Sequence, residues 1–285
     1  MILHTHDYTA LISMALAEDI GNGDLTSRAL IPEERMGRAK IIAKESLVVC
    51  GQEIAKNVFS AVDPGVSYTA LLRDGAPASP GSALGEASGP LRSILTAERT
   101  VLNFLQRLSG ISTLAARIVA QVQDLPVKIL DTRKTTPGWR KLEKYAVRMG
   151  GATNHRQGLF DAVLVKNNHI DAIGGDVGKA VSLCRGSAPR GVEITVEVRN
   201  RAELESAVAA QPDVILLDNM KPEAMREAVE FIRSHSAAKP IRSEASGGIN
   251  ESNVRECAAT GVDRLSLGIL THSARAVDIS LSYSG

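Results

Sequence analysis

From about residue 125 onward the sequence repeats a short apolar run, a loop and an amphipathic stretch, and this alternation constrains the fold more than any other feature. The apolar runs are Val127–Leu130, Ala162–Val165, Val192–Val198, Val214–Leu217, Ile241–Ala245 and Val262–Leu267. Stretches with helical periodicity lie between them, such as Lys141–Met149, Arg201–Ala210 and Pro222–Ile232. Strands that alternate with helices predict a parallel sheet. We therefore expect six βα units curled into an α/β barrel.

The first hundred residues follow a mixed pattern. Asp7 is expected to cap a helix. The apolar face of that helix comprises Leu11, Ile12, Ala15 and Leu16. A strand-like run follows at Ala39–Ala43, and the period is helical from Ser93 to Leu108, where Gly110 is expected to end the helix. We predict an N-terminal α+β domain over residues 1–110 and a catalytic barrel domain over residues 111–285, whose C-terminal segment is free to return to the first domain.

Bulk composition excludes several classes of protein. Lys and Arg total 33 against 32 Asp and Glu, and aromatic residues make up 3% of the chain, so neither charge nor stacking favours nucleic acid. No stretch has the length of a membrane span, and the N-terminus lacks the pattern of a signal peptide. The three cysteines are far apart and form no CxxC pair, which is typical of reduced thiols. We expect a cytoplasmic protein that binds neither nucleic acid nor membranes.

Every predicted strand ends in polar or glycine-rich residues. The strand ends are Asp131–Lys134, Lys166, Glu197, Asp218–Asn219, Glu244–Gly248 and Ser266–Gly268. In α/β barrels the active site forms at the carboxyl ends of the strands. A single polar residue at a strand end can be there only because the strand meets solvent. Polar residues at the ends of all six predicted strands instead predict an active site at this edge, the mouth of the barrel.

The charged residues at this mouth limit the class of ligand that it could bind. The basic candidates are Arg133, Lys134, His155, Arg156 and Lys166. So many potentially cationic groups would repel one another unless an anion lay among them, and arginine suits carboxylate or phosphate. For any one of these residues a solvated basic loop remains the competing explanation.

Two acidic residues and two glycine-rich segments complete the candidate site. Glu197 and Asp218 could ligate Mg²⁺, accept hydrogen bonds from sugar hydroxyls or stabilise positive charge, or they could simply pair with the nearby cations. Ser246–Gly248 and Ser266–Gly268 would let backbone N–H groups approach a phosphate, although glycine also makes ordinary turns.

Several of these segments resemble the quinolinate phosphoribosyltransferase family, also called nicotinate-nucleotide pyrophosphorylase (carboxylating). The block that carries the resemblance runs through Asp131–Gly138, Leu142–Arg148, Asn154–Arg156 and Lys166–Ile170. Further matches are Leu95–Thr100, Leu216–Met220, Ala245–Ile249 and Leu265–Gly268. The resemblance extends from Glu18–Gly21 to Ala276–Ser280 and so covers almost the whole chain.

The resemblance implies an enzyme of NAD synthesis that joins quinolinate to phosphoribosyl pyrophosphate with Mg²⁺ and releases CO₂ and pyrophosphate. It implies an incomplete six-stranded α/β barrel with an N-terminal open-faced sandwich, and a homodimer in which Arg99 enters the neighbouring subunit's site. By the same resemblance Lys134, Lys166, Glu197 and Asp218 would be catalytic. The substrate-binding residues would be Arg99, Thr132, Arg133, Lys134, His155, Arg156, Lys166, Glu197, Asp218, Ser246, Gly247, Gly248, Ser266, Leu267 and Gly268.

The chain departs from the family pattern at three places beside the site. Asn167 stands where the family usually has Asp, Ala152–Thr153 replaces a Gly-Val pair, and Arg199 occupies a position where acidic or small residues are commoner. These departures leave room for a paralogue, and two other functions stay open. Lys166 could form a Schiff base with a phosphosugar in a barrel lyase, or the chain could be a non-catalytic anion-binding paralogue.

Overall fold

The structure, a computed structural model, describes residues 3–236 and 240–284, which form two compact units. Within the described residues, the antiparallel unit comprises the chain up to Ala116, Thr135–Gly151 and the segment from Leu270 onward. The parallel unit comprises Arg117–Lys134 and Ala152–Ile269. Each unit is named after the main sheet that it contains.

The parallel unit is built on one six-stranded sheet in the order β6–β11–β10–β9–β8–β7, with all neighbours parallel. Its strands are β6 (Lys128–Leu130), β7 (Val163–Val165), β8 (Ile194–Val198), β9 (Val214–Asp218), β10 (Arg242–Ser246) and β11 (Arg264–Ser266). One of them falls in each predicted apolar run, so the predicted sheet is confirmed. Among the described residues β6 and β7 lie at opposite edges, so the sheet does not close into a complete barrel.

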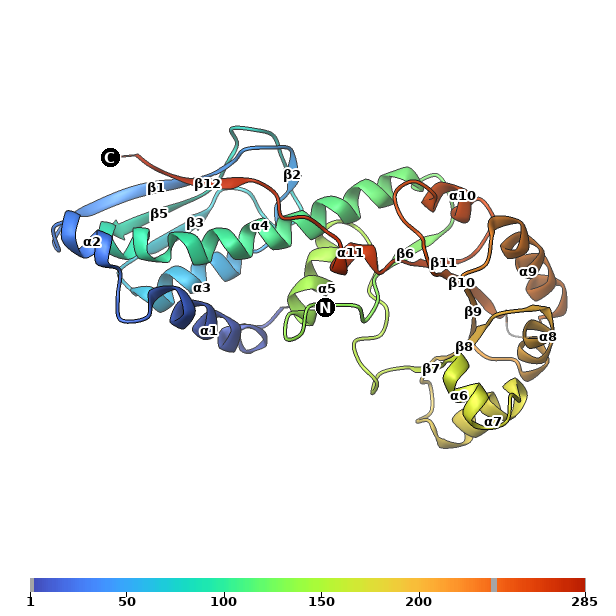
Figure 1. The fold of residues 1–285 in the computed structure, drawn as a ribbon. Helices are drawn as coiled ribbons and strands as arrows, with labels where there is room; N and C mark the ends of the chain where they lie inside the picture. Colours follow the sequence, from blue (N-terminus) through green and yellow to red (C-terminus); the bar gives the residue numbers. More distant parts are fainter. Residues whose placement is uncertain (1–2, 237–239, 285) are drawn as a thin grey trace. The chain divides into compact units, whose positions relative to one another are not determined.

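Helices cover the outer face of this sheet (Figure 1). They are α6 (Asn167–Ala172), α7 (Val177–Ser187), α8 (Arg201–Ala210), α9 (Pro222–His235) and α10 (Val254–Ala258). The side chain of Asn200 caps α8 by accepting from the Glu203 backbone N–H at 3.0 Å, and Pro222 starts α9, where a missing N–H costs nothing. β9 is buried from Val214 to Leu217, because a parallel sheet with both faces covered needs apolar side chains on both.

The antiparallel unit carries a four-stranded sheet in the order β12–β1–β5–β3. Its strands are β1 (Met36–Ala43), β3 (Ser67–Ala70), β5 (Ala83–Pro90) and β12 (Ile279–Tyr283), and β2 (Leu47–Val48) pairs with β4 (Pro77–Ala78) separately. Ala39, Ile41 and Ala43 of β1 are buried while Arg38 and Lys40 are exposed, so this sheet buries one face. The pairing of β12 with β1 joins the C-terminal segment to this unit.

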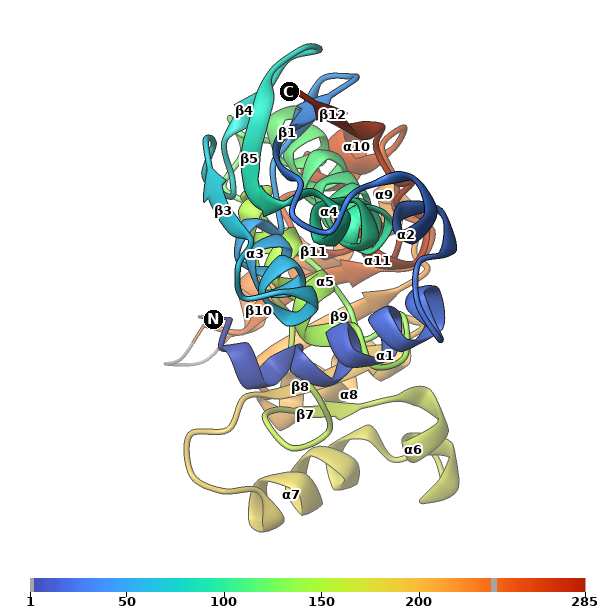
Figure 2. The same ribbon diagram turned by 90° about the vertical axis from the view of Figure 1, so that its left-hand side faces the viewer.

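The other elements are mainly helical (Figures 1 and 2). They are η1 (Thr5–Asp7), α1 (Thr9–Ile20), α2 (Leu25–Leu30), α3 (Gln52–Val62), α4 (Leu91–Gln121), α5 (Arg140–Met149) and α11 (Ile269–His272). The predicted face of α4 is confirmed, since Ile94, Ala97, Val101, Leu105 and Leu108 are all fully buried. Within the described part of the chain, no helix is long and apolar enough to cross a membrane.

The predicted cap of the first helix was wrong. Tyr8 occupies the N-cap position of α1, and Asp7 is instead the last residue of η1. The Asp7 carboxylate accepts from the His4 backbone N–H at 3.0 Å and pairs with Lys141. Of the expected apolar face only Ile12 is fully buried. Asp7 therefore pairs with a lysine that is distant in the sequence, although its position just before the helix predicts a capping role.

The predicted helix end at Gly110 was also wrong, because α4 continues through it to Gln121. A Cβ atom at position 110 would lie 2.0 Å from the carbonyl oxygen of Arg275, on the segment that leads to β12. Glycine is required here because another stretch of backbone approaches the helix, and not because the helix stops.

We expect Gly110→Ala to destabilise the protein by about 1–3 kcal/mol, because the new methyl group would overpack against the Arg275 backbone. Gly186→Ala is the matched control: Gly186 lies within α7, and its Cβ would meet nothing within 4 Å. The control should be neutral or stabilising by up to about 1 kcal/mol, since alanine favours helix. Urea unfolding curves measure both changes, and a Gly110→Ala protein as stable as wild type would contradict the packing account.

Candidate active site

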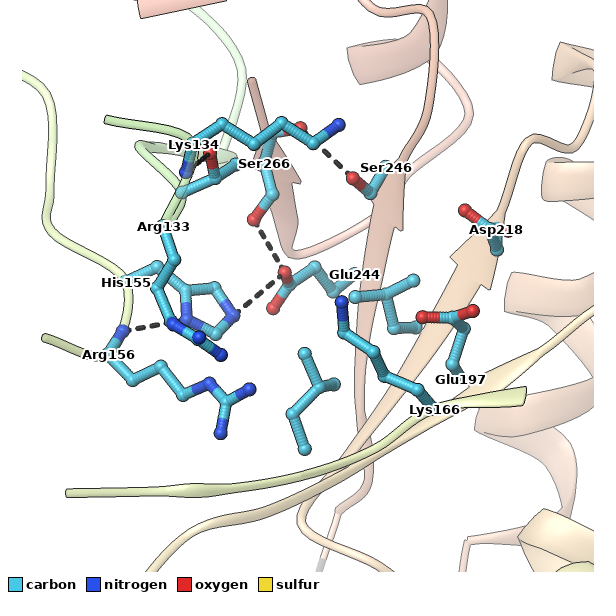
Figure 3. A pocket seen from close by; sticks show the side chains of 13 residues that line it. Arg133, Lys134, His155, Arg156, Lys166, Glu197, Asp218, Glu244, Ser246 and Ser266 are labelled. Atoms are coloured by element: carbon cyan, nitrogen blue, oxygen red, sulfur yellow. Dashed lines mark hydrogen bonds and ion pairs between the residues drawn. The ribbon is translucent and has the colours of Figure 1, made fainter. Parts of the chain in front are cut away.

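A pocket in the parallel unit receives side chains from all six strands or the residues that directly follow them. It is lined by Thr132, Arg133, Lys134, His155, Arg156, Leu164, Lys166, Glu197, Leu216, Asp218, Glu244, Ser246 and Ser266. Figure 3 shows the labelled side chains converging on this space. Parallel strands bring their carboxyl ends to one edge of a sheet, so residues more than a hundred positions apart meet here.

The structure brings ten of the predicted site residues together in this pocket, although their assigned roles remain predictions. Gly247, Gly248, Leu267 and Gly268 follow β10 and β11 without lining it. Gly247 has φ +97°, and a Cβ there would lie 2.2 Å from Asn219 Oδ1, so this turn needs glycine. Arg99 lies on α4 in the antiparallel unit, where it is exposed.

The basic side of the pocket is held by a buried carboxylate. Asp131 follows β6 and is fully buried. It accepts from the His155 backbone N–H at 2.8 Å and from Asn154 Nδ2 at 2.6 Å, which ties the Asn154–Arg156 loop to the end of the strand. Arg156 Nη1 in turn donates to the Ala162 carbonyl oxygen at 3.0 Å. The side chains of His155 and Arg156 are therefore held in place by this loop before any ligand arrives.

Two guanidinium groups crowd one another on this side. Arg133 and Arg156 lie close together beside His155 (Figure 3). Burial lowers the pKa of the Arg156 guanidinium, and the positive charge of Arg133 lowers it further. An anion between the two groups would relieve both effects, and arginine binds carboxylate or phosphate through two parallel hydrogen bonds. The arrangement is suited to an anionic ligand.

The acidic side lies on adjacent strands, with Glu197 on β8 and Asp218 on β9. Asn167 Nδ2 donates to Glu197 Oε1 at 2.6 Å. Burial raises the pKa of Glu197 and the negative charge of Asp218 raises it further, while Lys166 opposes the shift. The two carboxylates therefore leave a local excess of negative charge that a cation or a positively charged reacting carbon would reduce.

Two neighbouring carboxylates are the kind of ligand that Mg²⁺ can share with the phosphates of a bound molecule. Residues 3–236 and 240–284 contain no group of three or more His, Cys, Asp and Glu side chains that could hold a metal ion. Mg²⁺ commonly binds through one or two carboxylates and completes its shell with water and substrate phosphates. Glu197 and Asp218 could supply the protein's share of such a shell.

Three pocket residues were missed by the sequence analysis: Leu164, Leu216 and Glu244. Each lies two residues before a predicted site residue on the same strand or strand end, namely Lys166, Asp218 and Ser246. Side chains two apart on a strand share a face, so this periodicity could have identified them. Glu244 was noted at a strand end but assigned no role.

Comparisons with known proteins find matches over most of the chain. The family model for the N-terminal domain of quinolinate phosphoribosyl transferase matches residues 24–109, and the C-terminal domain model matches residues 111–282. A Bacillus subtilis protein described as probable nicotinate-nucleotide pyrophosphorylase (carboxylating) is 42% identical, over 95% of this chain and 91% of its own length. A Synechocystis protein of the same description is 44% identical, over 88% and 84%.

A solved structure supports the same relationship. The nicotinate-nucleotide pyrophosphorylase of Francisella tularensis superposes with a TM-score of 0.93 at 39% identity. The match covers 99% of this chain and 98% of that one. A Pyrococcus furiosus structure at 17% identity, with a TM-score of 0.74, shares the fold.

We expect Glu197→Gln to stabilise the folded protein at neutral pH in the absence of metal and substrates. A raised pKa in the folded state means that the stability contributed by Glu197 is present below its ordinary pKa of 4.5 and is lost as pH rises through the raised value. Glutamine removes that loss, so the variant's advantage in thermal midpoint should shrink as the pH falls toward 4. Glu205→Gln, on the exposed side of α8, should change stability by no more than about 0.5 kcal/mol. An advantage for Glu197→Gln that grew on acidification would contradict this reasoning.

Proposed function

The chain belongs to the quinolinate phosphoribosyltransferase family, and from this premise we propose that it transfers the phosphoribosyl group of phosphoribosyl pyrophosphate to quinolinate. The products are nicotinate mononucleotide, CO₂ and pyrophosphate, and the reaction belongs to NAD biosynthesis. One observation carries the proposal beyond family membership. The pocket combines Arg133, Lys134, Arg156 and Lys166 with the carboxylate pair of Glu197 and Asp218.

The basic side suits a planar dicarboxylate. Quinolinate has two adjacent carboxylates, and the forked donors of Arg133 and Arg156 can each bind one of them. Holding the ring in place also aims its nitrogen at the sugar carbon, so that positioning supplies much of the rate. After the nitrogen is alkylated, the neighbouring carboxylate leaves as CO₂, the adjacent positively charged ring nitrogen stabilises the electron pair left on the ring carbon, and a proton from solvent then binds to that carbon. No covalent nucleophile is required.

The acidic side suits the sugar. Departure of pyrophosphate develops positive charge on the sugar carbon, which the carboxylates of Glu197 and Asp218 can stabilise. The glycine-rich turns after β10 and β11 could present backbone N–H groups to the 5′-phosphate. We propose Mg²⁺ as cofactor, held through Glu197 and Asp218, directly or through water, and when bound it would neutralise charge on the leaving pyrophosphate.

The two alternative functions find little support. A Schiff-base lyase needs a desolvated lysine, yet Lys166 is exposed in this chain. A non-catalytic paralogue would be expected to lose charged residues from the pocket, whereas the predicted cations and carboxylates that line it are all present. Mg²⁺-dependent formation of nicotinate mononucleotide, with release of pyrophosphate, tests the proposal directly, and a purified protein without this activity would refute it.

Quinolinate should be used as acceptor, and nicotinate very poorly or not at all. Nicotinate lacks the second carboxylate, so some cations in the pocket would stay desolvated without a partner, at a cost of roughly 1–3 kcal/mol for each. The ratio of kcat/KM for the two acids, measured at saturating phosphoribosyl pyrophosphate, gives the discrimination. Equal turnover of both acids would show that the cation cluster serves another purpose.

We also propose a homodimer with shared active sites. Arg99 is exposed on α4 and forms no ion pair with any described residue. Leu159 and Phe160 are 74% and 85% exposed in the loop that follows His155 and Arg156, and two adjacent apolar side chains of this kind are suited to contact with a partner. A second copy of the chain could cover this loop and supply Arg99 to the pocket.

Two inactive variants should restore activity together if the site is shared. In a mixed dimer of Arg99→Ala and Lys166→Ala chains, one site would lack both residues and the other would be intact. Random pairing makes about half of the dimers mixed, so unfolding and refolding the two chains together should recover about a quarter of wild-type activity. Each variant refolded alone is the control. Mixed dimers that form but stay inactive would mean that Arg99 does not act across subunits.

A further inference from the structure

Glu244 is a fully buried carboxylate at the floor of the pocket. It lies on β10 between Leu216 of β9 and Arg264 of β11, which are its partners in the sheet register. Burying a charged carboxylate inside a sheet is costly unless its oxygens are paired. The contacts of the two Glu244 oxygens therefore indicate which neighbouring groups the carboxylate stabilises.

The two oxygens differ in their partners. Oε1 accepts from Ser266 Oγ at 2.5 Å and lies 3.3 Å from His155 Nε2 (Figure 3). Oε2 has no hydrogen-bond partner among the described residues and lies 3.8 Å from Arg264 Nη1. The carboxylate thus directs its hydrogen bonding toward the ring of His155 and the hydroxyl of Ser266.

Arg264 is held mainly by another residue. Its guanidinium donates to both oxygens of Glu193, at 2.7 Å and 3.0 Å, and Glu193 also accepts from Arg242 at 2.6 Å. These side chains form a row of alternating charge that runs from the exposed Arg242 to the buried Glu244. Because the guanidinium of Arg264 donates its hydrogen bonds to Glu193, it compensates the negative charge of Glu244 only in part.

The other nitrogen of the His155 ring is fixed as well. The backbone N–H of Arg156 donates to Nδ1 at 2.7 Å, so Nδ1 is an acceptor and carries no proton. The proton of the neutral ring is then on Nε2, the nitrogen that faces Glu244. The ring links the buried carboxylate to the backbone of a pocket arginine.

We propose that Glu244 is a positioning residue that orients the His155 ring through the proton on Nε2, and through that ring sets the place of Arg156, while the Arg156 N–H keeps Nδ1 unprotonated. The uncharged ring of His155 then forms a fixed part of the pocket surface beside the bound acceptor. The sequence had suggested that His155 is a cation. The kinetic consequence rests on the proposed function, whereas the state of the ring does not.

The ring can be observed in the wild-type protein. With ¹⁵N-labelled histidine, NMR correlations through the ring protons distinguish a protonated nitrogen from an unprotonated one, and His155→Gln assigns the signals by their loss. We expect one tautomer, with Nε2 protonated and Nδ1 not. A ring protonated on Nδ1 alone or on both nitrogens would overturn the proposal whether or not any variant folds.

Glu244→Gln tests the carboxylate itself, with Glu244→Asp as a second variant if the first does not fold. We expect the His155 signals to shift, and kcat/KM for quinolinate to fall roughly 10- to 100-fold, by analogy with the loss of partners that orient metal-bound histidines. KM for phosphoribosyl pyrophosphate should stay close to wild type. A folded variant with wild-type His155 signals and wild-type kinetics would overturn the proposal.

The matched control is Glu143→Gln. Glu143 is also fully buried and is paired with Arg107 at 2.8 Å, but it lies in the antiparallel unit. Both variants should lose stability, and only Glu244→Gln should change the His155 signals. If the wild-type protein formed no nicotinate mononucleotide, the proposed function would fail, and the ring signals would still decide the role of Glu244.

Discussion

Parallel pairing of six short strands is the constraint on which the rest of this molecule depends. Because the strands of the sheet run in the same direction, their carboxyl ends meet along one edge, and the residues that follow them share one pocket. Lys134 and Ser266 come together there although 132 residues separate them in sequence. The connecting helices bury the outer face and leave this edge to loops, so chemistry can be concentrated at the edge without disturbing the core.

Charged side chains lie close together in and beside the pocket of the parallel unit. The partly exposed Glu193 pairs with Arg264, which lies 3.8 Å from the buried Glu244, and Arg133 and Arg156 crowd one another at the mouth. Buried ion pairs seldom stabilise a fold more than well-packed apolar residues would. Sites that bind charged ligands commonly retain such strain, because the ligand completes the electrostatics that the empty protein leaves unbalanced.

Local sequence patterns predicted most of the fold, because secondary structure depends mainly on residues that are close in sequence. All six strands of the parallel sheet and the buried face of α4 follow from apolar periodicity. The two errors at helix ends have one cause. The partner of Asp7 is Lys141, and the group that demands glycine at position 110 is the backbone of Arg275. Both partners are more than a hundred residues away, and no local rule can include them.

The sequence by itself determined the order of strands and helices, the polar strand ends and the two sets of opposite charge that form the pocket. Only the tertiary structure decided which of those residues touch. It placed Glu244 under His155, directed the Arg156 N–H at the ring and left the glycine-rich turns beside the pocket lining. The physical reason is that burial and hydrogen bonding depend on distances in space. Strand order and register set those distances, and spacing along the chain leaves them open.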